Sequence, residues 1–169
     1  MRRGRYRRQL TRNQKLAGSA VAAGLLLALA HGQTPPAAVT ASATVPSGGA
    51  YTPSSWAAGL LSAGGWPQTS CNLAAVTAWE QAEGGNWHNG AAFNPLDTTQ
   101  PEPGSWGINS VNAQAYPSWR AGFTATLTTL GNGNYGPILA ALRSGGSAQA
   151  VADAVAASPW GTSAFQASC

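Results

Sequence analysis

Basic side chains are almost missing from most of this sequence. Of its nine lysines and arginines, only Arg120 and Arg143 follow residue 15. All five acidic residues lie in that same part, so the chain beyond residue 15 has a net charge of −3, although the whole chain has +4. A groove that follows a nucleic-acid backbone needs clustered lysines and arginines. We therefore expect no nucleic-acid partner and no electrostatic steering of an acidic substrate.

Histidine and cysteine are also scarce, which limits metal and cofactor chemistry. The sequence has two histidines and two cysteines, and their spacing is not that of a metal site. The run 131–136 fits the pattern G-x-G-x-x-G, but it follows a helical pattern rather than a strand, so we interpret it as a turn between helices. We expect neither a metal nor an organic cofactor.

The first 30 residues have the pattern of a signal peptide. Seven basic residues precede an uncharged apolar segment, 16–30, which ends in the small-x-small cleavage site Ala28-Leu29-Ala30. The apolar run is shorter than the roughly 20 residues of a membrane-spanning helix, and an uncleaved anchor is the alternative. We therefore expect a secreted monomer that has no membrane contact after cleavage.

The rest of the chain divides into a linker and one domain. Residues 31–50 are mostly Pro, Ala, Thr, Ser and Gly, which predicts a disordered linker because such a segment cannot build a core. Residues 51–169 contain all seven tryptophans and are enough for one compact domain.

Apolar residues recur at helical spacing in five segments of this domain. They predict helices over 54–63, 70–83, 117–130, 135–142 and 148–155. Ser70 is expected to cap the second helix, and Pro117 to occupy the first turn of the third. Turn-forming and β-branched residues between 86 and 116 predict a short hairpin. The predicted fold class is α+β, mostly α.

The two cysteines, Cys71 and Cys169, predict one disulfide bond, because an even pair in an exported chain usually forms a bridge. The alternative is a thiol peptidase in which Cys71, at a helix N-terminus, is the nucleophile and His88 is the base. His88 lies just beyond the same helix as Cys71, and this spacing argues against the peptidase.

A glutamate ends the second predicted helix, directly before two glycines. The apolar stripe of this helix contains Leu73, Val76 and Trp79, with Glu83 near its centre and Glu80 nearer its edge. A carboxyl group beside Trp79 loses hydration, which raises its pKa and suits it to donate a proton, as in glycosidic cleavage. Glu80 in the same role, or a merely solvated Glu83, are the alternatives.

Several different short motifs lie along residues 70–163. They are Ala78-Trp79, Ala82-Glu83-Gly84-Gly85, Asn94-Pro95-Leu96-Asp97-Thr98-Thr99, Tyr116-Pro117-Ser118, Tyr135-Gly136 and Ser158-Pro159-Trp160-Gly161-Thr162. This series resembles the lysozyme-like domains of actinobacterial and phage wall-lytic proteins, within a superfamily that includes lytic transglycosylases and goose-type lysozymes. The resemblance implies a lysozyme-like domain over 51–169, peptidoglycan glycan strands as substrate, a cell-wall or extracellular location, and Glu83 rather than Glu80 as general acid.

The same resemblance, with the loop positions around the expected cleft, suggests where the glycan binds. The expected substrate contacts are Trp87, Asn94, Asp97, Thr98, Thr99 and Trp106. Alternatively, the Asn, Asp and Thr side chains only build the turn, and the tryptophans fill the core.

The position of Asp97 more often holds Asn in the family, so the resemblance does not supply a second catalytic carboxylate. Water assisted by Asp97 or Glu102 can complete a hydrolysis, and a sugar hydroxyl can instead give an anhydro product. A secreted module that binds wall glycan without cleaving it is the alternative function.

Overall fold

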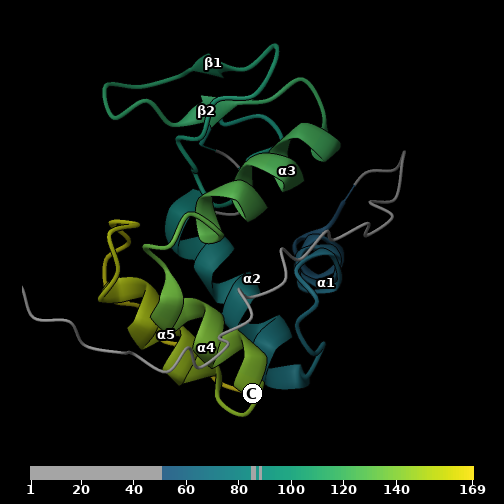
Figure 1. The fold of residues 1–169 in the computed structure, drawn as a ribbon, viewed down its shortest axis with the longest axis vertical. Helices are drawn as coiled ribbons and strands as arrows, with labels where there is room; N and C mark the ends of the chain where they lie inside the picture. The colour runs from purple at the N-terminus through teal and green to yellow at the C-terminus, as the bar shows by residue number, and fades with distance from the viewer. Residues whose placement is uncertain (1–50, 85–86, 88) are drawn as a thin grey trace, which may run out of the picture. The chain divides into compact units, whose positions relative to one another are not determined.

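The computed structural model describes residues 51–84, 87 and 89–169. The predicted signal peptide, the predicted linker and His88 lie outside these residues. The described residues form five helices and one two-stranded antiparallel sheet (Figure 1), so the prediction of a mostly helical α+β chain is confirmed. None of the described helices is long and apolar enough to cross a membrane.

The helices and strands follow the predicted order. Their bounds are α1 Pro53–Ala63, α2 Ser70–Gly84, β1 Trp106–Gly107, β2 Gln114–Ala115, α3 Trp119–Leu130, α4 Gly136–Ser144 and α5 Ala148–Ala156. Trp106 pairs with Ala115 and Gly107 with Gln114, so the predicted hairpin is present but very short. The run 131–136 connects α3 to α4, as predicted.

Two predicted helix starts are wrong by one or two residues. Ser70 is already in the first turn of α2, and the Thr69 hydroxyl takes the capping role by accepting the backbone N–H of Asn72 at 3.1 Å. Pro117 precedes α3 instead of opening it. Ser118 is the extended N-cap residue there, so helical backbone begins only at Trp119.

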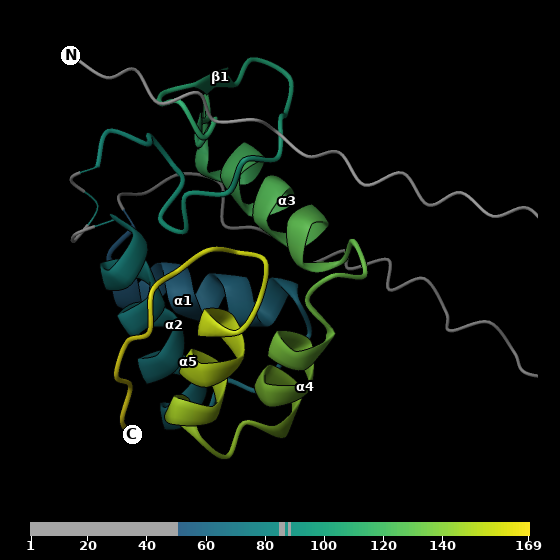
Figure 2. The same ribbon diagram turned by 90° about the vertical axis from the view of Figure 1, so that its left-hand side faces the viewer.

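The main core lies where α2 packs against α1 and α5, and α4 packs against α5 (Figures 1 and 2). Its largest fully buried apolar side chains include Trp56, Leu60, Leu61, Val76, Trp79, Phe123, Leu130, Ile138 and Leu142. The rings of Trp56 and Phe123 stack with centroids 5.2 Å apart, which joins α1 to α3. The burial of these aromatic and aliphatic groups is the main stabilising contribution in this region.

The loop that follows α2 and the hairpin lie against α3 at one end of the described region (Figures 1 and 2). Gly122 on α3 allows this approach, because a Cβ there would be 1.9 Å from the carbonyl oxygen of Phe93. The backbone N–H of Tyr116 donates to the carbonyl of Ala92 at 2.9 Å. The ring of Phe93 also packs against that of Trp119 on α3, with centroids 5.0 Å apart. Close backbone approach and aromatic contact therefore hold the loop on α3.

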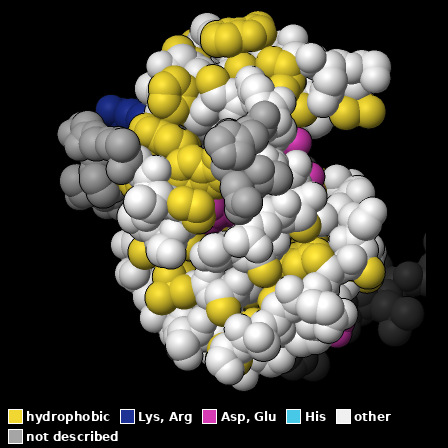
Figure 3. All heavy atoms as spheres, turned by 180° about the vertical axis from the view of Figure 1, so that it is seen from behind, with side chains coloured by type: hydrophobic (Ala, Val, Ile, Leu, Met, Phe, Trp, Pro, Cys, Tyr) yellow, Lys and Arg dark blue, Asp and Glu magenta, His cyan; other side chains and the backbone are white. Residues whose placement is uncertain are grey.

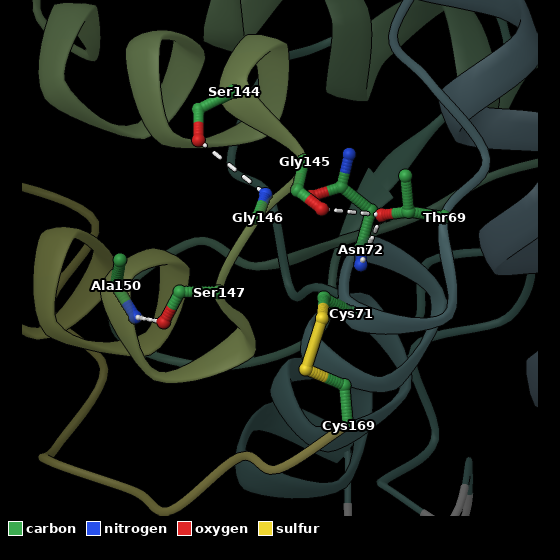
Figure 4. The surroundings of a disulfide bond; sticks show 9 residues. All are labelled: Thr69, Cys71, Asn72, Ser144, Gly145, Gly146, Ser147, Ala150 and Cys169. Carbon is green, nitrogen blue, oxygen red and sulfur yellow. Dashed lines mark hydrogen bonds between the residues drawn. A yellow bond between two sulfur atoms is a disulfide. The ribbon is translucent and has the colours of Figure 1, made fainter.

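A disulfide bond joins Cys71 in the first turn of α2 to Cys169, with the two Cα atoms 4.5 Å apart (Figure 4). The predicted pairing is confirmed. The peptidase alternative is wrong, because the Cys71 sulfur is bonded to another sulfur and cannot act as a thiolate nucleophile. Beside the bridge, the Thr69 hydroxyl donates to the carbonyl of Gly145 at 2.7 Å, which ties α2 to the end of α4.

Candidate active site

Three carboxyl groups surround the C-terminal end of α2. Glu80 and Glu83 lie almost one turn apart on this helix, and Asp97 lies in the loop that follows it. The charge of Glu83 acts on Asp97 strongly enough to raise the Asp97 pKa, so the helix and the loop bring these two groups near each other. On the face drawn in Figure 3, acidic side chains are visible among apolar and uncharged groups, with a basic group near one edge.

Glu83 is half-buried and is held by a residue from the far end of the domain. The hydroxyl of Thr162 donates a short hydrogen bond to Glu83 Oε1, and the indole N–H of Trp79 donates to Thr162 Oγ1 at 3.2 Å. Burial raises the pKa of Glu83 above its usual 4.5, and the hydrogen bonds from Thr162 and Trp79 oppose that rise. The prediction that desolvation beside Trp79 raises this pKa therefore has the right sign.

The contact of Thr162 with Glu83 was not predicted. Thr162 is the last residue of the motif Ser158–Thr162, so the sequence marks it. Nothing in the local pattern indicates a partner 79 positions earlier.

Glu80 is completely buried, at 0% exposure, although the helical stripe predicts a position nearer the edge. That expectation is wrong because α2 is covered from several sides: α1 and α5 pack on it, and Trp87 folds back over it. Glu80 Oε2 accepts the indole N–H of Trp87 at 2.8 Å, and Oε1 has no hydrogen-bond partner among the described residues. Burial raises the pKa of Glu80 to about 8 despite the Trp87 bond, which favours the neutral acid.

Asp97 is half-buried and has left-handed backbone, with φ of 51°. The side-chain amide of Asn89 donates a short hydrogen bond to its Oδ1. Burial, followed by the charge of Glu83, raises the pKa of Asp97 to about 6. Asp97 therefore ionises near neutral pH and at a lower pH than Glu80.

Two of the expected substrate contacts are internal. Asn94 and Thr98 are 1% and 2% exposed. The Asn94 amide donates to the carbonyls of Thr98 at 2.9 Å and Gln114 at 2.7 Å, and its oxygen accepts the N–H of Thr98 at 3.0 Å. The hydroxyls of Thr98 and Thr129 are 2.7 Å apart. Their burial argues against direct contact with a glycan, and their hydrogen bonds fit the alternative that they build the turn.

The other expected contacts are more accessible. Trp106 on β1 is 55% exposed and Thr99 is also exposed. Trp87 is half-buried, with its ring centroid 5.0 Å from that of Trp119. Both rings help to line a surface pocket of about 310 Å³ whose walls also include Phe93. Trp119 is half-buried and packs against the core.

The described residues thus form a small, mostly helical domain in which the half-buried carboxyl groups of Glu83 and Asp97 and the buried carboxyl group of Glu80 lie around the end of α2. Within the described residues, no three His, Cys, Asp or Glu side chains gather as they would around a metal ion. Comparisons of the chain with family models, with curated proteins and with solved structures found no match.

Proposed function

We propose that this protein is a secreted, lysozyme-like hydrolase that cleaves the glycosidic bonds of peptidoglycan, with Glu83 as the general acid. The observation that carries the proposal is the setting of Glu83: a half-buried carboxyl at the end of α2, with a raised pKa, fixed by Thr162 and facing Asp97. The order of α2, loop, hairpin and three further helices supports the lysozyme-like assignment, together with the motifs along residues 70–163.

Glu83 acts by giving its proton to the glycosidic oxygen as the bond to the sugar carbon breaks. Its partial burial keeps a larger share of Glu83 protonated near neutral pH than water would allow. Asp97, whose pKa is about 6, is ionised above that pH and is placed to assist an incoming water. Capture by a sugar hydroxyl gives an anhydro product from the same first step.

Glu80 is excluded from the acid role by its position. Its side chain has no exposed surface, and one of its oxygens already binds the indole of Trp87. A glycosidic oxygen cannot reach it without opening the fold. Glu80 therefore contributes to the structure beside the site.

A second candidate function is a module that binds wall glycan without cleaving it. The exposed indole of Trp106 favours it, because a solvent-facing tryptophan offers a flat surface for a sugar ring. In a gel containing cell walls, clearing supports the hydrolase, and binding without clearing supports the module.

The proposal is tested by comparing Glu83→Gln with Glu80→Gln in a cell-wall lysis assay on oxidised protein. Glutamine keeps the shape of the side chain but cannot supply the proton, so Glu83→Gln should lower the rate by about 10² to 10⁴-fold. Glu80→Gln should retain most of the activity. Wild-type activity should fall as pH rises through the Glu83 pKa.

Circular dichroism of both variants is the control for folding. A folded Glu83→Gln protein that lyses walls at nearly the wild-type rate would show that another group is the acid.

A further inference from the structure

A chain of two hydrogen bonds ends on the proposed acid. It runs from the indole N–H of Trp79 to the hydroxyl of Thr162, at 3.2 Å, and from that hydroxyl to Glu83 Oε1. Trp79 and Glu83 are one turn apart on α2, whereas Thr162 belongs to the segment after α5. The two hydrogen bonds thus run from α2 to the segment after α5 and back to α2.

Each bond of this hydrogen-bond chain has an assigned donor and acceptor. An indole nitrogen only donates, so Thr162 Oγ1 must accept from Trp79. A threonine hydroxyl has one hydrogen, and Glu83 Oε1 is its other partner, so that hydrogen is directed at Oε1. Glu83 Oε1 is therefore an acceptor in this arrangement, and a neutral Glu83 carries its proton on Oε2.

We propose that Thr162 is a positioning residue that selects Oε2 of Glu83 as the oxygen from which the acid proton is delivered. The identity of the proton acceptor rests on the proposed function, whereas the hydrogen-bond chain does not. Once the proton has left, the hydroxyl of Thr162 stabilises the carboxylate, because a hydrogen bond to a charged acceptor is stronger than one to a neutral acceptor. The contact therefore strengthens as the reaction proceeds.

The segment that carries Thr162 is itself anchored. Two residues earlier, the indole N–H of Trp160 donates to the carbonyl of Leu96 at 2.9 Å, and its ring packs edge-on against Trp79 with centroids 4.8 Å apart. Thr162 is 8% exposed. These contacts therefore hold the backbone of this segment beside α2, within reach of Glu83.

Few other groups can titrate beside this chain. Asp97 faces Glu83 from the loop, and Glu80 precedes it on α2. Helix α1 has no charged side chain, and Asp153 on α5 is exposed and accepts a bond from Gln149. Within the part of the chain that the structure describes, Asp97 and Glu80 are the two neighbours whose ionisation must be followed together with that of Glu83.

The test is a carbon-13 NMR titration of the Glu83 carboxyl in wild type, Thr162→Val and Thr162→Ser. Valine keeps the branched shape and removes the hydroxyl, so the Glu83 pKa should rise by about one unit, as expected from losing one hydrogen bond to a carboxylate. Serine keeps the hydroxyl and should restore the wild-type value. Ser163→Ala, which removes the exposed neighbouring hydroxyl, is the matched control and should cause no shift.

In the lysis assay, Thr162→Val should lower kcat by about tenfold, as expected from losing one net hydrogen bond, with KM unchanged. The alkaline limb of its pH profile should move upward with the Glu83 pKa. An unchanged Glu83 pKa in Thr162→Val would overturn the inference even if the protein lyses walls. A raised pKa in a protein without lytic activity supports the hydrogen-bond chain and contradicts the proposed function.

A wild-type measurement keeps the inference testable if Thr162→Val does not fold. The indole N–H signal of Trp79 should shift with the same pKa as the Glu83 carboxyl, because Trp79 bonds the hydroxyl that donates to Glu83 and itself acts on the Glu83 carboxyl. A Trp79 signal that does not change through that titration would also overturn the inference.

Discussion

The helical region and the loop region of this protein are held together in different ways. Helices α1, α2, α4 and α5 are joined by buried apolar side chains. Residues 89–118 are instead joined by many hydrogen bonds, both within the backbone and between side chains and backbone. Examples are the three bonds of Asn94 and the bond from the Tyr116 hydroxyl to the carbonyl of Gln100 at 2.6 Å. The site lies where the two regions meet, with Glu83 from one and Asp97 from the other. Rigidity can thus be supplied by packing on one side and by polar contacts on the other.

The largest expected effect on stability comes from the disulfide of the helical region. The bridge closes a loop of 98 residues, which in the chain-entropy model is worth about 4–5 kcal/mol. The double variant Cys71→Ala, Cys169→Ala should therefore unfold at a much lower urea concentration than oxidised wild type. Equal midpoints for the two proteins would contradict this expectation.

One substitution in each region tests this difference between packing and hydrogen bonding. Leu60→Ala in α1 leaves a cavity at a position with 0% exposure and should cost about 2–5 kcal/mol. Asn94→Ala should cost about 2–4 kcal/mol, because two carbonyls and one N–H each lose a buried hydrogen bond, although the Thr98 carbonyl keeps the bond from the Gln114 N–H. Hydrogen exchange separates them: Leu60→Ala should speed exchange throughout the helices, and Asn94→Ala chiefly within 89–118.

Asn94→Asp is the matched control for the loop variant. It keeps the acceptor for the Thr98 N–H but sets a carboxylate oxygen, which only accepts, against the carbonyls of Thr98 and Gln114, so its cost should be at least that of alanine. A uniform increase in exchange for Asn94→Ala would show that the two regions open as one unit.

The next effect is a dependence of stability on pH that comes from Glu80. Burial raises its pKa from 4.5 to about 8 in the folded state, so the fold holds a proton that the unfolded chain releases. This contribution to stability is complete below about pH 4.5 and is lost as pH rises through about 8, on the order of a few kcal/mol in total. The raised pKa values of Glu83 and Asp97 act in the same direction.

Chemical denaturation of wild type and Glu80→Gln at several pH values measures this effect. In Glu80→Gln, the free energy of unfolding should decline much less between pH 5 and 8 than in wild type. The same slope in both proteins would show that Glu80 does not hold the proton.

The smallest expected effect on stability belongs to the hairpin surface. Trp106→Ala should change the free energy of unfolding by less than about 0.5 kcal/mol, because the indole is largely exposed. It should weaken glycan binding by about 2- to 10-fold, the range expected for one aromatic stacking contact. Ser110→Ala, at an exposed position of the same hairpin, is the control and should alter neither quantity in a pull-down with insoluble cell walls.

The helical region follows local patterns and was largely predictable. Apolar spacing and glycine pairs place the helices within about two residues, and export with an even cysteine count predicts the disulfide. The position of Glu83 at a helix end is likewise a local property. The burial of Glu80 is not local, because it depends on how α1, α5 and Trp87 cover the helix.

The loop region could be predicted only in outline for the same reason. The partners of Asn94 and Thr98 include residues 20 and 31 positions away, and the partner of Glu83 is 79 positions away. A turn pattern in the sequence indicates that such side chains form hydrogen bonds. The partners of these bonds are known only from the fold.

The indole of Trp160 has a consequence for the energetics of binding. It bonds the carbonyl of Leu96, the residue before Asp97, and it lies two positions before Thr162. One hydrogen bond therefore sets the spacing between the loop that carries Asp97 and the segment that orients Glu83. With this spacing fixed before any ligand arrives, binding need not spend part of its free energy on ordering the two sides of the site.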